Sequence, residues 1–199
     1  MANAYFVWDV DRVIFHIAGP LALRWYSILF LGGILIGNAL FLRMAKSEGK
    51  PLEGLDTLLY YIVIGTVVGA RLGHVLFYGF ESYLRDPLSI LKVWEGGLAS
   101  HGGYLGVIIA MYVFMRRHGQ GKFTYLWLAD RMAICAIMAG GFIRLGNFFN
   151  SEIVGKVTDV PWAVIFKKVD SLPRHPSQIY ESLGYFAVSL FLYITYRYY

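Results

Sequence analysis

The sequence has 199 residues, of which 57% are hydrophobic and only 16% are charged, and its formal net charge is +5. A soluble domain of this length carries more charge, so the composition predicts an integral membrane protein. The modest positive charge fits loops that face anionic lipid, and no basic run with interleaved aromatic residues indicates a nucleic-acid partner. The single cysteine, Cys135, lies in an apolar stretch, where packing is favoured over catalysis.

Five apolar stretches follow one another along the chain, and we expect each to form a membrane-spanning helix. They cover residues 21–42, 55–78, 101–115, 125–145 and 177–196. The predicted fold class is therefore all-α, a polytopic membrane helix bundle of about five spans that forms one integral membrane domain over residues 1–199. The longest polar stretch, 147–176, shows short β-like alternation near Trp162, and we expect it to be a small extracytoplasmic segment.

The distribution of basic residues predicts the orientation of the spans. Lys and Arg are dense in the short loops 43–54 and 116–124 and at the C-terminus, which is typical of the cytoplasmic side. The opposite ends of the spans then carry Arg71, His101 and Arg144. We therefore expect these polar groups to lie at one membrane depth, near the outer surface.

Glycines at four-residue spacing mark the second span. Gly65, Gly69 and Gly73 predict a seam of small residues at which another helix packs closely. Near the start of the fourth span, Asp130 and Arg131 lie toward the opposite face of the membrane. We interpret them as structural.

The stretch from Gly140 to Gly155 closes the fourth span with an arginine, two amides and a carboxylate. Arg144 and Asn147 are three residues apart, so they share a face at a helical end. Together they predict a donor-rich pocket for an anion such as a phosphate. The alternative is a structural arginine that snorkels or pairs with Glu152.

Other polar residues allow two readings each. His101, at a glycine-rich helix start, is either a general base or headgroup donor, or a histidine hydrogen-bonded at a helix end beside packing glycines. Tyr26 is either an interfacial aromatic or a site hydroxyl, and the segment 174–181 reads first as a helix cap. The histidines lack carboxylates at metal-ligand spacing, and no cofactor fingerprint appears, so neither metal nor cofactor is expected.

Several of these segments, in this order, resemble the prolipoprotein diacylglyceryl transferase family. The most specific is Ile143-Arg144-Leu145-Gly146-Asn147-Phe148-Phe149-Asn150-Ser151-Glu152-Ile153-Val154-Gly155, which is similar to the family signature. Further likeness lies in the segments 23–26, 69–78, 96–103 and 174–181, so that the resemblance covers nearly the whole chain.

The resemblance implies a multi-pass enzyme of the bacterial inner membrane. It would transfer the diacylglyceryl group of phosphatidylglycerol to the thiol of the lipobox cysteine in a prolipoprotein signal peptide, with a thioether formed and glycerol phosphate released. The partners implied are therefore phosphatidylglycerol, the signal peptide and membrane lipid, with no nucleic acid.

The resemblance also implies roles for individual residues of this chain. Arg144 would contact phosphatidylglycerol, and Tyr26, Asn147, Glu152 and Gly155 would be important for the site. From the chemistry, Arg144 would also stabilise the leaving phosphate, helped by Asn147 and by Arg71, and His101 is our candidate base for the thiol.

The sequence departs from the family pattern in two places. Members usually continue past the last span with further membrane segments and another functional arginine, and they more often have an aromatic residue at the position of Ser100. An alternative is therefore a non-catalytic or truncated membrane protein that binds lipid or signal peptide on the same scaffold. A small transporter is a weaker third reading, because paired broken helices and midplane carboxylates are not apparent.

Overall fold

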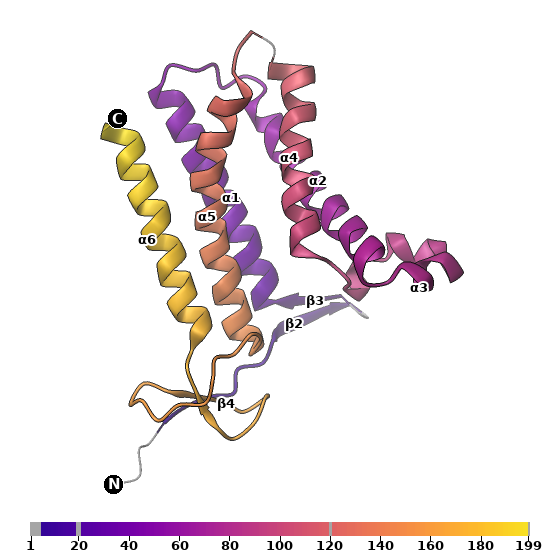
Figure 1. The fold of residues 1–199 in the computed structure, drawn as a ribbon, viewed down its shortest axis with the longest axis vertical. Helices are drawn as coiled ribbons and strands as arrows, with labels where there is room; N and C mark the ends of the chain where they lie inside the picture. The colour runs from indigo at the N-terminus through magenta and orange to yellow at the C-terminus, as the bar shows by residue number, and fades with distance from the viewer. Residues whose placement is uncertain (1–4, 19–20, 120, 199) are drawn as a thin grey trace. The chain divides into compact units, whose positions relative to one another are not determined.

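In the computed structural model, which describes residues 5–18, 21–119 and 121–198, long helices dominate the chain (Figure 1). They are α1 (Trp25–Ser47), α2 (Leu55–Phe77), α4 (Ser100–Phe114), α5 (Tyr125–Asn150) and α6 (Ser177–Tyr198). The chain divides into two compact units, one made of residues 1–41 and 132–199 and the other of residues 42–131. The division falls within α1 and α5.

The helical membrane class predicted from the sequence is confirmed. A helix lies at each of the five expected places, and α1, α2 and α5 are long and apolar enough to cross a membrane. Helix α4 has 15 residues and continues into a π-helical turn, Met115–Gly119. That all five helices span the membrane remains a prediction.

The first helix begins at Trp25, later than the expected residue 21, because the preceding residues form a strand. Strand β2 (Val13–Ala18) pairs antiparallel with β3 (Leu21–Arg24), with Val13 opposite Arg24. The β-branched residues of β2 favour extended backbone. Apolar composition alone does not distinguish this hairpin from the start of a helix, which explains the error at this boundary.

A small sheet of order β1-β4-β5 contains the β-like alternation seen in the sequence. Strand β4 (Val164–Phe166) pairs antiparallel with β5 (Pro173–Arg174) and parallel with β1 (Phe6–Trp8), with Phe6 opposite Val164. The N-terminal strand therefore belongs to the same sheet as the segment after α5. The sequence predicted the extended character of β4 but not its distant partner.

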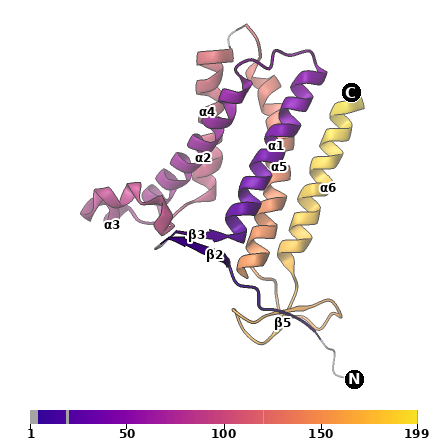
Figure 2. The same ribbon diagram turned by 180° about the vertical axis from the view of Figure 1, so that it is seen from behind.

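In the first unit, helices α5 and α6 run side by side (Figures 1 and 2). Two buried serines of α6 tie the helices together, since Ser182 Oγ donates to Gly141 O and Ser189 Oγ to Ile134 O, each at 3.0 Å. Such hydrogen bonds between helices matter in an apolar medium, where water does not compete for the donor.

In the second unit, α2 packs on α4 along the predicted glycine seam. A Cβ atom added to Gly69 would lie 2.8 Å from Gly106 Cα, and one added to Gly73 would lie 2.8 Å from Gly102 Cα. Backbone therefore touches backbone, which only glycine permits at this distance. The seam fixes the start of α4, and hence His101, against the end of α2.

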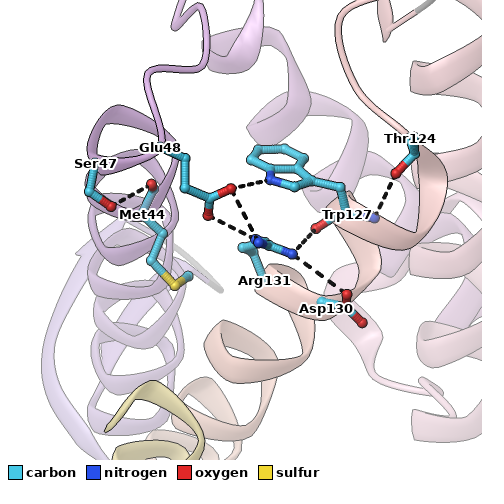
Figure 3. A network of polar contacts seen from close by, with 7 residues as sticks. All are labelled: Met44, Ser47, Glu48, Thr124, Trp127, Asp130 and Arg131. Carbon is cyan, nitrogen blue, oxygen red and sulfur yellow. Dashed lines mark hydrogen bonds and ion pairs between the residues drawn. The ribbon is translucent and has the colours of Figure 1, made fainter. Parts of the chain in front are cut away.

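In the second unit, a polar network links the residue that follows α1 to the first turns of α5 (Figure 3). The carboxylate of Glu48 accepts from Trp127 Nε1 at 2.6 Å and from Arg131 Nε at 3.0 Å. Arg131 also contacts Asp130 at 3.5 Å. The contacts support the interpretation of Asp130 and Arg131 as structural.

Two adjacent glycines of α4, Gly102 and Gly103, test whether close backbone contact at the glycine seam stabilises the second unit. We expect Gly102→Ala to lower the free energy of unfolding by about 1–3 kcal/mol, because its Cβ would meet the backbone of Gly73 at 2.8 Å. Gly103→Ala is the matched control, since its Cβ would meet Ala70 only at an ordinary 3.6 Å. Thermal unfolding in detergent measures both, and equal losses in the two variants would contradict the seam.

Candidate functional site

Arg144 lies in the last two turns of α5, on the side that faces α6. Its Nε is 2.7 Å from Oε2 of Glu181, and the two side chains are 25% and 39% exposed. The sequence offered Glu152 as the ion-pair partner, whereas the structure places Glu181 there. Among the described residues, no other polar partner is recorded for the guanidinium of Arg144, so its terminal nitrogens remain able to bind an anion.

The C-terminus of α5 folds back on itself through Ser151. This residue has a left-handed φ of 56°, its N–H donates to Phe148 O, and the N–H of Glu152 donates to Asn147 O at 2.9 Å. These two bonds form a Schellman cap, which usually has glycine in the left-handed position. A second non-glycine residue, Ile153, has a φ of 54°. Such strain persists where surrounding contacts over-determine the backbone, as often happens at functional sites.

The reversed chain brings the carboxylate of Glu152 back over the helix end. Asn147 Nδ2 donates to it at 3.4 Å and Asn150 Nδ2 at 3.2 Å. From α6, Gln178 Nε2 donates to the backbone oxygen of Glu152 at 2.6 Å. Three amides therefore fix one glutamate, and both Asn147 and Gln178 are buried.

Tyr26 and Gly155 lie around the same helix end. A Cβ atom on Gly146 would come within 2.7 Å of the Tyr26 ring, so the tyrosine lies directly on the backbone of α5, within electrostatic range of Arg144 and Glu152. Gly155 donates its N–H to His175 O at 3.1 Å, and a Cβ there would approach that oxygen to 2.5 Å. Only glycine fits this crossing of two loops.

Arg71 belongs to the second unit and has an entirely different environment. All five N–H groups of its guanidinium donate to backbone oxygens, which belong to Ser89, Ile90, Lys92, Gly96 and Gly97. The acceptors lie in the connection formed by α3 (Phe80–Arg85) and two 3₁₀ turns, Pro87–Leu91 and Val93–Glu95. Arg71 therefore organises this connection, and its predicted role in binding substrate remains a prediction.

His101 occupies the first turn of α4 with an exposed side chain. Its ring packs against Phe77, with centroids 5.0 Å apart, and against Tyr78 at 5.9 Å. Its imidazole forms no hydrogen bond with the described residues. This argues against the alternative reading of His101 as a histidine hydrogen-bonded at a helix end. The ring is accessible to an external proton donor, as a general base requires.

The structure thus groups the predicted residues in two sets. Arg144, Asn147, Glu152, Gly155 and Tyr26 gather at one end of α5 in the first unit, while Arg71 and His101 belong to the second. The convergence of His101 with Arg144, which the sequence predicted, remains a prediction.

Sequence reasoning missed the contribution of α6. Gln178, Glu181 and Ser182 all contact α5 or the turn that follows it, whereas the residues of this segment themselves indicated a helix cap, and its likeness to the family assigned none of these three residues a role. A signal was present, because positions i, i+3 and i+4 share one face and polar groups on one face of an apolar helix need partners.

An arginine, three amides and two carboxylates gather at the end of the apolar helix α5. Such a group is suited to a polar headgroup at the edge of a bilayer, so the fold and the site define a membrane protein with a headgroup-binding site. The family model described as prolipoprotein diacylglyceryl transferase matches residues 12–199. The chain belongs to this family of transferases.

Curated relatives named phosphatidylglycerol–prolipoprotein diacylglyceryl transferase agree with this assignment. The chain is 53% identical to that of Tolumonas auensis over 96% of its own length and 72% of the relative's. It is 46% identical to that of Chloroherpeton thalassium, with 98% and 71% covered, and 45% identical to that of Vibrio cholerae, with 87% and 63% covered.

The crossing at Gly155 can be tested by one added methyl group. We expect Gly155→Ala to lose at least about tenfold in transfer activity, because the methyl group would push the turn carrying Glu152 away from His175 O. Gly184→Ala is the control, since its Cβ would meet nothing within 4 Å. Activity per folded protein, compared between the two variants, is the measurement, and full activity of Gly155→Ala would contradict the tight crossing.

Proposed function

We propose that this chain transfers the diacylglyceryl group of phosphatidylglycerol to the lipobox cysteine of a prolipoprotein, in the first step of lipoprotein maturation. Membership of the transferase family supports this proposal. The observation in the structure that carries it is the placement of Arg144 beside Asn147, Glu152 and Tyr26 at one helix end. By the same reasoning we place the protein in the bacterial inner membrane as a multi-pass protein, with segment 147–176 on the extracytoplasmic side.

The proposed reaction replaces a carbon–oxygen bond by a carbon–sulfur bond. The cysteine sulfur attacks the glyceryl carbon that bears the phosphate, the bond from this carbon to the phosphate oxygen breaks, and glycerol phosphate leaves with the electron pair. Negative charge therefore grows on the leaving phosphate, and a guanidinium aimed at it stabilises the transition state. The terminal nitrogens of Arg144 are available for this task.

The thiol must lose its proton in the same reaction. A free cysteine has a pKa of about 8.5, so a base near the thiol accelerates attack near neutral pH. His101 is the residue that we propose as base, because its ring is exposed and none of the described residues is recorded as its hydrogen-bond partner. The thiol proton would pass to the imidazole.

The remaining predicted residues would shape the headgroup site. Asn147 and Glu152 are held rigidly by one another and by Asn150, which preorganises the polar surface beside Arg144. Tyr26 covers the backbone of α5 at Gly146, between Arg144 and Asn147. Arg71 would contribute by holding the connection 86–97, from which α4 and His101 begin.

Arg144→Ala tests the anion site directly. We expect transfer from labelled phosphatidylglycerol to a lipobox peptide to fall by at least about 100-fold, because the leaving phosphate loses its charged donor. The protein should still insert, since the variant removes one partly exposed charge from a chain of apolar helices. Full activity of the variant would disprove the anion site, and Arg144-dependent lipid binding by wild-type protein without transfer would favour the non-catalytic alternative.

Cys135→Ala tests whether the chain uses a thiol of its own. Cys135 belongs to α5, is 4% exposed and packs against α1, where a Cβ on Gly37 would lie 3.5 Å from it. We expect a loss of about 1 kcal/mol in the free energy of unfolding and unchanged transfer per folded protein. A marked loss of turnover would show that the thiol takes part in the reaction.

A further inference from the structure

Glu181 contacts the one arginine on which the proposed reaction depends. Its Oε2 lies 2.7 Å from Arg144 Nε, and it projects from the second turn of α6. The carboxylate therefore engages the inner edge of the guanidinium. The fork formed by the two terminal nitrogens is the edge that binds a phosphate through two parallel bonds.

The position of Glu181 is fixed on both sides by hydrogen bonds within the first unit, from α6 to α5 and to the turn that follows α5. Three residues before it, Gln178 donates to Glu152 O at 2.6 Å, and one residue after it, Ser182 donates to Gly141 O at 3.0 Å. Both flanking side chains are almost completely buried. Helix α6 consequently cannot rotate or slide without breaking buried bonds, so Glu181 is held firmly against Arg144.

The charges at this helix end are unusual for a site that binds an anion. Arg144 is accompanied by two carboxylates, those of Glu181 and Glu152, within the first unit. A nearby carboxylate repels a bound phosphate and so weakens its affinity for the arginine. Weak affinity is useful for the product, because a tightly held glycerol phosphate would limit turnover.

We propose that Glu181 is a positioning residue for Arg144. It orients the guanidinium fork toward the phosphate, and its negative charge limits the affinity of Arg144 for the released glycerol phosphate. The inference rests on the proposed function for its kinetic consequences. Its geometric basis, the Arg144–Glu181 pair between the clamped helices α5 and α6, is independent of the substrate.

Two substitutions separate orientation from charge. Glu181→Gln keeps an oxygen to contact Arg144 Nε but removes the charge, so we expect the Kd of glycerol phosphate to fall about five- to tenfold. The kcat should fall too, as product release slows, and the KM for phosphatidylglycerol should decrease. Glu181→Ala removes the orienting contact as well, and we expect at least about a tenfold loss in kcat/KM.

Ser189→Ala is the matched control on the same helix. It removes the buried bond from α6 to Ile134 O, far along the helix from Arg144, and should lower the Tm by about 2–4 °C. Its affinity for glycerol phosphate should equal that of wild-type protein. A purely structural role for Glu181 would give all three variants this same pattern.

The experiment measures glycerol phosphate binding by calorimetry on the full chain in detergent, alongside steady-state transfer kinetics. Tighter binding in Glu181→Gln, but not in Ser189→Ala, supports the proposal. Unchanged or weaker binding in Glu181→Gln overturns it, as does wild-type protein that binds no glycerol phosphate. Absence of transfer in wild-type protein that still binds glycerol phosphate would reject the proposed function alone, because the binding comparison then decides the role of Glu181.

Discussion

The reversal of the chain after Asn150 is the constraint on which the first unit depends. Ser151 adopts a left-handed backbone, which costs about 1–2 kcal/mol for a residue with a Cβ, and the Schellman bonds turn Glu152 back over the helix end. The amides of Asn147, Asn150 and Gln178 then fix this glutamate. Without this turn, the carboxylate would point away along the helix axis and the polar site beside Arg144 would not form.

Arg71 and Arg144, the two arginines near the expected membrane surface, have different roles because they contact different partners. Every N–H group of the Arg71 guanidinium donates to a backbone oxygen. The side chain therefore holds the connection between α2 and α4, whose carbonyl groups would otherwise lack these partners. Arg144 meets a carboxylate at one nitrogen and has no other recorded polar partner among the described residues. The first arrangement is saturated, whereas the second can still accept an anion.

Helix α6 contributes both to the packing of the first unit and to the geometry of the site. Its buried serines attach it to α5, and its first two turns carry the residues that orient Glu152 and Arg144. Packing and site geometry therefore rest on one polar stripe. A substitution in the first two turns of this stripe will affect stability and chemistry together, whereas one at Ser189, which lies on the same stripe but away from Arg144, should affect stability alone.

The sequence by itself determined the membrane class, the places of the five long helices, the glycine seam of Gly65, Gly69 and Gly73, and the position of Arg144 and Asn147 three residues apart at the end of α5. These features follow from composition and from the helical repeat, which are local properties of the chain. It did not determine the strand at residues 21–24, the parallel pairing of β1 with β4, or the choice of Glu181 over Glu152 as the partner of Arg144. Only the tertiary structure decided these. The strand at 21–24 escaped because apolar composition does not distinguish a hairpin from the start of a helix, and the other two depend on which distant segment meets the chain, about which local propensity carries no information.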